Sequence, residues 1–276
     1  MTKATENPRH VSNRLHFIEG RHNSRVKQFR RAFAQSELTE EGNCAIEGLR
    51  IVEEAIRSGL RFQSVIFSAS AEAKAQRLLP QIGANVETVV LPDKLFASTV
   101  PSETPQGVAA LVRMKQSSLD DVIVKALAGP LIAIAGVQDP GNLGTILRSA
   151  EAFGAAGVIL GEGTVSPFNT KVVRASAGSI FRLSLARTKL ADALGQMRAH
   201  GIRLIATSSH RGTPLPEAKL EPPLAIFIGS EGAGLPKNLL AEMDELVAIP
   251  HSPQVESLNA GVAASIVLYE IARSRE

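Results

Sequence analysis

Cysteine and tryptophan are almost absent from this chain of 276 residues: Cys44 is the single cysteine, and there is no tryptophan. One cysteine excludes an intramolecular disulfide and is typical of proteins in a reducing compartment. Aromatic residues make up only 4% of the chain. This low content disfavours the kind of surface on which successive single-stranded bases stack.

Long apolar segments are lacking as well. No run approaches the ~20 residues that a membrane-spanning helix needs, and residues 1–10 are polar, without the apolar region of a signal peptide. Hydrophobic residues nevertheless make up 44% of the chain, which is enough to form real cores. We therefore expect a soluble, cytoplasmic protein of roughly two domains, without membrane contact.

Several signatures of cofactor chemistry are also missing. The chain has no G-x-x-x-x-G-K-[ST] phosphate loop, and Gly141 and Gly144 do not follow the G-x-G-x-x-G spacing of dinucleotide sites. It has no G-x-S-x-G elbow of a serine hydrolase. The histidines are scattered and Cys44 has no second cysteine beside it, so we expect no metal site.

Positive charge is concentrated near the start of the chain, although the net charge is only +3. Residues 9–31 contain seven Lys or Arg residues and only one acidic residue, Glu19. A basic segment of this kind commonly contacts phosphates, but a solvated helix face accounts for a charge run equally well.

The first part of the chain alternates short apolar strands with helices. Val26, Phe29 and Phe33 fall at helical spacing after Asn23, with basic residues on the other side. Further helices are expected at 48–58, 72–79 and 94–98, and strands at 44–46, 64–67, 86–90 and 108–112. This alternation is typical of a small α/β domain, and residues 115–121 have the composition of a linker.

The second part of the chain predicts a doubly wound parallel α/β unit. The apolar run 131–137 is typical of a central parallel strand, and a helix from about Leu143 to Phe153 follows, with Arg148 opposite its buried stripe. We expect Asn142 to cap this helix and Ser257 to cap the last one. The remaining predicted strands are 157–160, 202–207, 224–228 and 246–249, and the remaining helices are 170–178, 189–200 and a long apolar helix from near 257.

Two loops in the last quarter of the chain follow neighbouring predicted strands, at residues 229–236 and 250–259. Loops at the carboxyl ends of neighbouring parallel strands form the ligand crevice of an open α/β sheet. The first loop is rich in glycine, which lets the backbone turn sharply or approach a ligand. We therefore expect the functional site at these loops.

The C-terminal helix is apolar on almost every side between Leu258 and Tyr269. A helix that is hydrophobic all round has to be buried all round. One face can cover its own sheet, and a second copy of the chain is the simplest cover for the rest. The alternative is a helix wholly inside a large monomer.

Three segments together resemble the motifs of the SpoU (TrmH-type) RNA methyltransferases of the SPOUT superfamily. DPGNLG at 139–144 with Arg148 resembles the first motif, IGSEG at 228–232 the second, and IP at 249–250 through SLN at 257–259 the third. They stand in the family's order across residues 131–269. Segments at 23–27, 62–68 and 105–108 resemble the family's substrate-binding domain, which is related to ribosomal proteins.

The resemblance implies an α/β protein of two domains. Residues 1–115 would form an RNA substrate-binding domain with a basic arm, and residues 116–276 a SPOUT methyltransferase domain whose parallel sheet contains a deep trefoil knot. The implied reaction transfers a methyl group from S-adenosylmethionine to a ribose 2′-hydroxyl in RNA, with ribosomal RNA favoured over transfer RNA. The implied assembly is a homodimer in which Arg148 works near the partner's cofactor, and no metal is implied.

Individual residues take roles from the same resemblance. The cofactor contacts fall at Gly229, Ile249 and Leu258, with Thr207 lining the pocket. Arg148 would be the catalytic residue and, since arginine stays protonated, would activate the hydroxyl electrostatically. The other implied catalytic-site residues, which orient the hydroxyl and shape the loops, are Asn142, Glu231, Ser257 and Asn259. The predicted RNA contacts are Arg25, Lys27, Arg30, Arg31, Lys171 and Arg174.

Each assignment also has a purely structural explanation. Without the motif, Arg148 would be a solvated surface arginine, Glu231 a loop carboxylate near a helix N-terminus, and Gly229 part of a tight turn. Three other functions remain open: a transfer RNA methyltransferase, an RNA-binding relative without activity, and a different nucleotide-dependent α/β enzyme. The intact motif residues argue against an inactive relative, and the missing glycine signatures argue against the last alternative.

Overall fold

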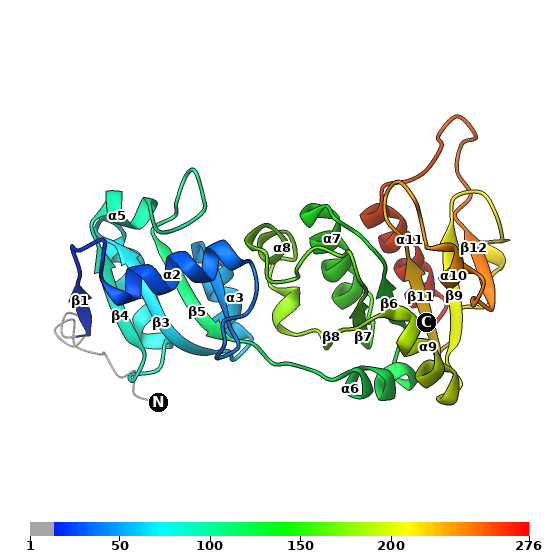
Figure 1. Ribbon diagram of the computed structural model, residues 1–276, viewed down its shortest axis with the longest axis horizontal. Coiled ribbons are helices and arrows are strands. Elements are labelled where there is room, and N and C mark those ends of the chain that lie inside the picture. Colours follow the sequence, from blue (N-terminus) through cyan, green and yellow to red (C-terminus); the bar gives the residue numbers. More distant parts are fainter. Residues whose placement is uncertain (1–13, 276) are drawn as a thin grey trace, which may run out of the picture. The chain divides into compact units, whose positions relative to one another are not determined.

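The computed structural model describes residues 14–275 (Figure 1). The described chain forms two compact units, residues 14–114 with 168–173 and residues 115–167 with 174–275. The polar start of the chain, including Arg9 and His10 of the predicted basic arm, lies outside the described residues. No helix in the described range has the length and apolar character to cross a membrane.

The first unit is built on a five-stranded sheet of order β1-β4-β3-β5-β2. Its strands β1, β4 and β3 run parallel, whereas β5 is antiparallel to both β3 and β2. The bounds are β1 (Leu15–Phe17), β2 (Asn43–Glu47), β3 (Arg61–Ser68), β4 (Glu87–Leu91) and β5 (Val108–Arg113). The sequence predicted four of these strands and missed β1, because three residues are too few to show an alternating pattern.

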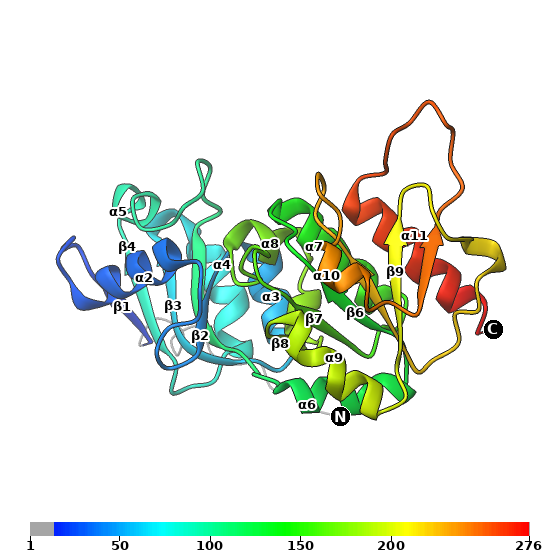
Figure 2. The same cartoon turned by 45° about the vertical axis from the view of Figure 1, so that its right-hand side comes forward.

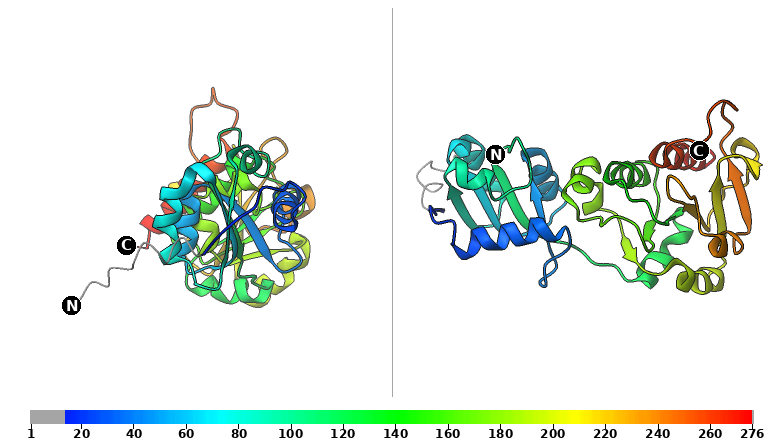
Figure 3. Two further views of the ribbon diagram at one scale, coloured as in Figure 1. Left: turned by 90° about the vertical axis from the view of Figure 1, so that its left-hand side faces the viewer. Right: turned by 45° about the horizontal axis from the view of Figure 1, so that its top comes forward.

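Helix α2 (Ser24–Gln35) covers one face of this sheet, as the right-hand view of Figure 3 shows. It begins where the side chain of Asn23 accepts a hydrogen bond from the Arg25 N–H. Its apolar stripe of Val26, Phe29 and Phe33 is buried in one core, together with residues of β3, β4 and β5. The other helices of the unit are α3 (Leu49–Arg57), α4 (Glu72–Leu78) and α5 (Asp93–Ala97).

The second unit is built on a seven-stranded parallel sheet of order β10-β12-β9-β11-β6-β7-β8. Its central strands are fully buried apolar runs, as parallel sheets require. The bounds are β6 (Leu131–Ile134), β7 (Gly157–Leu160), β8 (Leu185–Arg187), β9 (Arg203–Ser208), β10 (Thr213–Pro214), β11 (Leu224–Ile228) and β12 (Glu245–Ala248). The short strands β8 and β10 escaped the sequence prediction.

Helices cover both faces of the second sheet. Residues of α6 (Leu119–Ile123), α9 (Leu190–Ala199) and the loop and helix at α10 (Lys237–Leu240) share one core with the strands. Helices α7 (Pro140–Ala152) and α11 (Ala260–Arg273) pack side by side (Figure 2). The hydroxyls of Ser149 and Ser265 form a hydrogen bond of 2.6 Å between them. The remaining helix is α8 (Thr170–Ala175).

Three helix starts differ from the sequence predictions. Helix α6 begins within the expected linker, because Ser118 and Asp121 form a capping box. Asp139, and not Asn142, caps α7, since its carboxylate accepts the Asn142 N–H at 2.7 Å. Asn259, and not Ser257, caps α11 by accepting the Val262 N–H at 3.2 Å. The two capping predictions were therefore wrong.

Candidate functional site

Three predicted site residues meet in one hydrogen-bonded row. The side-chain amide of Asn142 donates to the carboxylate of Glu231 at 2.8 Å, and its carbonyl oxygen accepts from the amide of Asn259 at 2.8 Å. The side-chain oxygen of Asn259, the last member of the row, accepts the Val262 N–H and so caps α11. Because Asp139 caps α7, the Asn142 side chain is left to bridge the loops. The row thus joins one residue from each of the three motif segments.

The loop that carries Glu231 is a tight hairpin. The N–H and C=O groups of Ser230 and Gly234 bond to each other at 3.0 and 3.1 Å. A Cβ atom at Gly229 would lie 2.2 Å from the carbonyl carbon of Gly234. The hairpin itself therefore requires glycine at this position, so the tight-turn explanation of Gly229 is sufficient without a ligand.

Three of the predicted cofactor residues lie at the ends of β9, β11 and β12, which are neighbours in the sheet. Thr207 is near the end of β9, Gly229 directly follows β11 and Ile249 directly follows β12, whereas Leu258 lies just before α11. Thr207 donates its hydroxyl to the carbonyl of Phe227 at 3.2 Å. Within the described chain, the main-chain N–H groups of Ile249 and Leu258 make no hydrogen bond. Between them, His251 bonds the Ile249 carbonyl at 2.7 Å through Nδ1, while its buried Nε2 has no partner. This part of the site therefore offers unused polar groups to a ligand.

Arg148 does not join the row. It lies on α7, six residues after Asn142 and so about 9 Å further along the helix, and its side chain is exposed. It makes no hydrogen bond or ion pair with any residue from 14 to 275. Ser257 is also exposed and outside the row. In a single chain, therefore, the predicted catalytic arginine stands apart from the other site residues.

The C-terminal helix α11 has an apolar stripe that its own chain leaves uncovered. Val262, Ile266 and Tyr269 are 47%, 36% and 53% exposed, and their spacing places them on one side of the helix. The opposite side is buried at Ala264, Val267, Leu268 and Ile271. The helix is thus covered on one side only, which rules out the wholly internal helix for the described single chain.

A cavity of about 490 Å³ lies beside the row, and Glu231 is one of its walls. Thr207, Gly229, Ile249 and Leu258 are not among its lining residues. Two polar residues that the sequence analysis did not single out, Gln138 and Glu162, also line it; they follow β6 and β7. Their positions just beyond two parallel strands were the signal that could have identified them.

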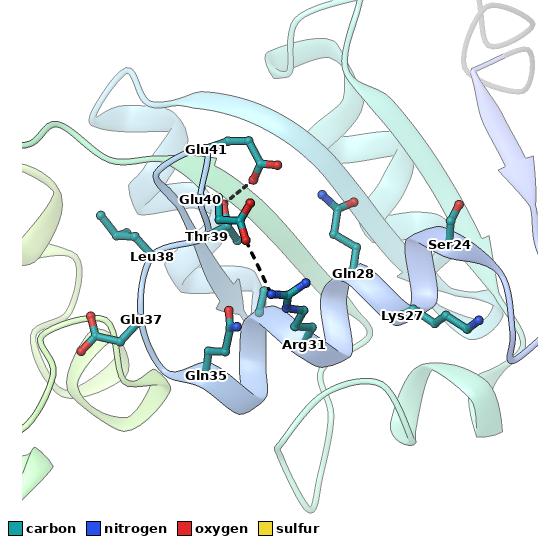
Figure 4. Close-up of a pocket in the computed structure, with 11 residues that line it drawn as sticks. Ser24, Lys27, Gln28, Arg31, Gln35, Glu37, Leu38, Thr39, Glu40 and Glu41 are labelled. Atoms are coloured by element: carbon teal, nitrogen blue, oxygen red, sulfur yellow. Dashed lines mark hydrogen bonds and ion pairs between the residues drawn. The ribbon is translucent and has the colours of Figure 1, made fainter.

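The basic face of α2 is less positive than the sequence suggests. The Arg25 guanidinium pairs with Glu87 at 2.6 Å, and Arg30 donates to the Ser98 hydroxyl at 2.8 Å. Figure 4 shows Lys27 and Arg31 along a groove whose opposite side carries carboxylates. This groove is about 580 Å³, and its acidic residues are Glu37, Glu40 and Glu41. The four predicted RNA contacts on α2 therefore differ in how strongly other groups of the protein hold them: Arg25, Arg30 and Arg31 have partners, and Lys27 has none in the described chain.

The remaining predicted residues and titratable groups add little to the site. Lys171 and Arg174 are exposed on α8. Burial raises the pKa of the Cys44 thiol to about 12, which keeps it protonated and unsuited to nucleophilic chemistry. No group of three or more His, Cys, Asp or Glu residues in the described range is arranged to hold a metal ion.

The chain thus combines a small mixed α/β unit with a parallel α/β unit that carries a three-loop site. Family comparison agrees. Residues 130–269 match the SpoU rRNA Methylase family, and residues 23–110 match the MRM3-like substrate binding domain. This chain belongs to the SpoU rRNA methylase family.

Individual relatives extend over nearly the whole chain. It is 32% identical over 254 residues to the 23S rRNA (guanosine(2553)-2′-O)-methyltransferase RlmP of Bacillus subtilis, covering 92% of this chain and 98% of the relative. The AdoMet-bound rRNA methyltransferase of Sinorhizobium meliloti superposes with a TM-score of 0.81 at 29% identity, covering 95% of this chain and 98% of that one. AviRb of Streptomyces viridochromogenes with AdoMet gives 0.80 at 28%, covering 92% and 98%. The predicted family and α/β class are confirmed.

Proposed function

We propose that this S-adenosylmethionine-dependent RNA 2′-O-methyltransferase acts on the ribose of a guanosine in 23S ribosomal RNA. The supporting observation is the row of Asn142, Glu231 and Asn259, which unites the three motif segments at one point. RlmP, which is named for this reaction, aligns with nearly the whole chain. The intact row also favours an active enzyme over an inactive RNA-binding relative.

The residues assigned to the cofactor fit it. A ligand with an adenine base and an amino-acid tail needs hydrogen-bond donors on the backbone beside apolar walls. The unused N–H groups of Ile249 and Leu258 meet that need. Because His251 donates its Nδ1–H to the Ile249 carbonyl, its unpartnered Nε2 adds an acceptor when the ring is neutral. We assign Thr207, Gly229, Ile249 and Leu258 to this pocket. When bound, S-adenosylmethionine supplies an already activated methyl group, so no metal or covalent intermediate is needed.

The protein's own task is to position the ribose hydroxyl and stabilise its developing negative charge. Glu231 and Asn142 orient the hydroxyl, since their side chains are fixed by each other and by Asn259. Ser257 and Asn259 shape the third loop. Arg148 supplies the positive charge that favours the alkoxide, which suits a residue that stays protonated.

The separation of Arg148 from the row supports a homodimer in which Arg148 of one copy serves the site of the other. The uncovered stripe of Val262, Ile266 and Tyr269 lies on α11, which packs beside the helix that carries Arg148. A second copy seated on this stripe buries it. Dimerisation through α11 therefore accounts for both the exposed stripe and the isolated arginine.

Two further family features belong to this proposal. The segment from β12 to α11 would pass through a loop of the chain as a deep trefoil knot, an exception to the rule against threading. Residues 1–115 would deliver RNA to the methyltransferase domain of residues 116–276. Lys27 is the exposed cation of α2 that best suits contact with phosphates, and Lys171 and Arg174 on α8 are exposed as well. Arg31 is also exposed, although its guanidinium lies 3.7 Å from the carboxylate of Glu40. Arg25 and Arg30 contribute less because other groups of the protein hold them.

Methyl transfer from radiolabelled S-adenosylmethionine tests the proposal. Unmodified 23S rRNA, 16S rRNA and transfer RNA transcripts serve as parallel substrates, and nuclease digestion identifies the methylated nucleoside. We expect 2′-O-methylguanosine in 23S rRNA alone. Label in transfer RNA alone would favour the other RNA class, and calorimetry without S-adenosylmethionine binding would favour the inactive relative.

A further inference from the structure

None of the residues assigned to the cofactor lines the cavity beside the row. It opens at the carboxyl ends of β6, β7 and β11, whereas the cofactor residues lie at the ends of β9, β11 and β12 and just before α11. Its volume of about 490 Å³ falls within the range of about 300–1,000 Å³ that small-molecule sites occupy. The hairpin that bears Glu231 borders it, so an occupant of the cavity lies next to the row.

The cavity combines apolar walls with two free polar side chains. Leu190, Ala135 and Pro236 supply apolar surface. The carboxylate of Glu162 and the amide of Gln138 supply polar groups, and neither makes a hydrogen bond with another residue of the described chain. Apolar faces with a few polar groups at the edge suit a planar, heterocyclic ligand.

Hydrogen bonds hold together the two loops that carry Glu162 and Gln138. The Gly161 N–H donates to the Ile134 carbonyl at 2.8 Å, and a Cβ at Gly161 would lie 2.7 Å from Leu190. The Thr164 hydroxyl donates to the same Ile134 carbonyl at 3.2 Å and accepts the Gly136 N–H at 3.1 Å. Glu162 is therefore held by a fixed loop against the cavity, as a recognition residue needs to be.

Glu162 and Glu231 differ in how many of their carboxylate oxygens already accept a hydrogen bond from the protein. One carboxylate oxygen of Glu231 already accepts the Asn142 amide at 2.8 Å. Both oxygens of Glu162 are uncommitted within residues 14–275. A carboxylate with two free oxygens accepts two parallel N–H groups.

We propose that this cavity receives the base of the target nucleotide, with Glu162 and Gln138 reading the Watson–Crick edge of guanine. The proposal rests on the proposed methyl transfer to a guanosine ribose. With the base in the cavity, its own ribose lies at the row formed by Asn142 and Glu231.

Guanine is the base whose edge matches these two side chains. Its N1–H and exocyclic amino group are adjacent donors that pair with the two oxygens of the Glu162 carboxylate. Its O6 is an acceptor that pairs with the Gln138 amide. Adenine, cytosine and uracil do not present two adjacent donors on this edge. RNA targets are read in this way on unstacked, splayed-out bases.

The test compares guanosine with inosine, which lacks only the exocyclic amino group. The probe is a 23S rRNA fragment that carries either nucleoside at the position corresponding to guanosine 2553, the site in the name of RlmP. For the wild type, inosine should lower kcat/KM by roughly 10- to 150-fold, because one hydrogen bond to a charged acceptor is lost. For Glu162→Gln, the guanosine fragment should lose roughly 10- to 100-fold, and the ratio of guanosine to inosine should fall to near one.

Controls separate this reading from other effects. Glu217→Gln removes an exposed carboxylate of the same unit that does not line the cavity, and it should behave as the wild type. The affinity for S-adenosylmethionine, measured by calorimetry, should be unchanged in Glu162→Gln; a marked loss would assign the cavity to the cofactor and overturn the proposal.

The possible failures are distinguishable. If the wild type leaves the guanosine fragment unmethylated, the proposed target is wrong, and the proposal that the cavity binds its base is refuted as well. If the wild type methylates guanosine and inosine equally well, or Glu162→Gln keeps the wild-type ratio, the enzyme's function stands and the base-reading role of Glu162 is refuted.

Discussion

Two substitutions at Asn259 separate its structural role from its role in the row. Its Oδ1 caps α11, and its Nδ2 donates to Asn142. Asn259→Ala removes both interactions. Asn259→Asp keeps an oxygen for the Val262 N–H but replaces the donor toward Asn142 with a second oxygen. If Asn142 turned its amide toward the new carboxylate, its own oxygen would face Glu231, so one repulsive contact remains in either orientation.

The expected magnitudes follow from these contacts. Loss of an N-cap costs about 0.5–2 kcal/mol, and the exposed hydrogen bond to Asn142 adds about 0.5–1 kcal/mol. Asn259→Ala should therefore lower the free energy of unfolding by about 1–3 kcal/mol, which corresponds to a Tm lower by roughly 2–12 °C at 2–4 °C per kcal/mol. Asn259→Asp should stay within about 1 kcal/mol of the wild type, because the cap remains.

The two Asn259 variants should differ in stability but not in activity. We expect both variants to lose about 10-fold or more in kcat, because either change releases Asn142 and Glu231 from their fixed geometry. Thermal unfolding and methyl transfer, measured on the same preparations below the lower Tm, test this. An Asn259→Asp enzyme with wild-type turnover would refute a functional role for the row, and an Asn259→Ala enzyme with wild-type Tm would refute the cap.

Four further predictions follow from the site and its surroundings. Arg148→Ala should reduce methyl transfer at least 100-fold while calorimetry gives an unchanged affinity for S-adenosylmethionine; wild-type turnover would contradict its catalytic role. Ile266→Asp should abolish dimerisation and activity together, so an active monomer in sedimentation would contradict the α11 interface. Neutralising Lys27 and Arg31 together should flatten the salt dependence of RNA binding by about 1.4–1.8 in log–log slope, whereas an unchanged slope would mean that they do not reach phosphates. Activity should survive a chelator as long as the RNA stays folded, and loss that a divalent ion restores would contradict metal-independent transfer.

The sequence predicted the elements whose pattern is local and missed those that depend on distant pairing. The run at Leu224–Ile228 was predicted with the bounds of β11 because a buried parallel strand is a continuous apolar run. Strand β1 forms only because Leu15–Phe17 pairs with β4, more than 70 residues away in the chain. Its sequence alone contains no comparable signal.

In the site, too, local sequence patterns were predicted and contacts between distant segments were not. The motif segments identified Asn142, Glu231 and Asn259, but not that their side chains form one row, because hydrogen bonds across 89 and 117 positions in the chain depend on the folded loops. The caps of α7 and α11 were misplaced since Asp139 and Asn259 compete locally with other good capping residues. Similarly, the basic segment looked uniformly positive because Glu87 is distant in sequence from Arg25.

Mapping of ribose methylation in cells tests whether this protein methylates a guanosine of 23S rRNA. Mass spectrometry of ribosomal and transfer RNA would be compared between the parent strain, a deletion strain, and deletion strains that express the wild type or Arg148→Ala. We predict that the deletion removes one 2′-O-methylguanosine from 23S rRNA, and that the wild type restores it whereas Arg148→Ala does not. An unchanged pattern of ribose methylation in 23S rRNA of the deletion strain would contradict the proposed function.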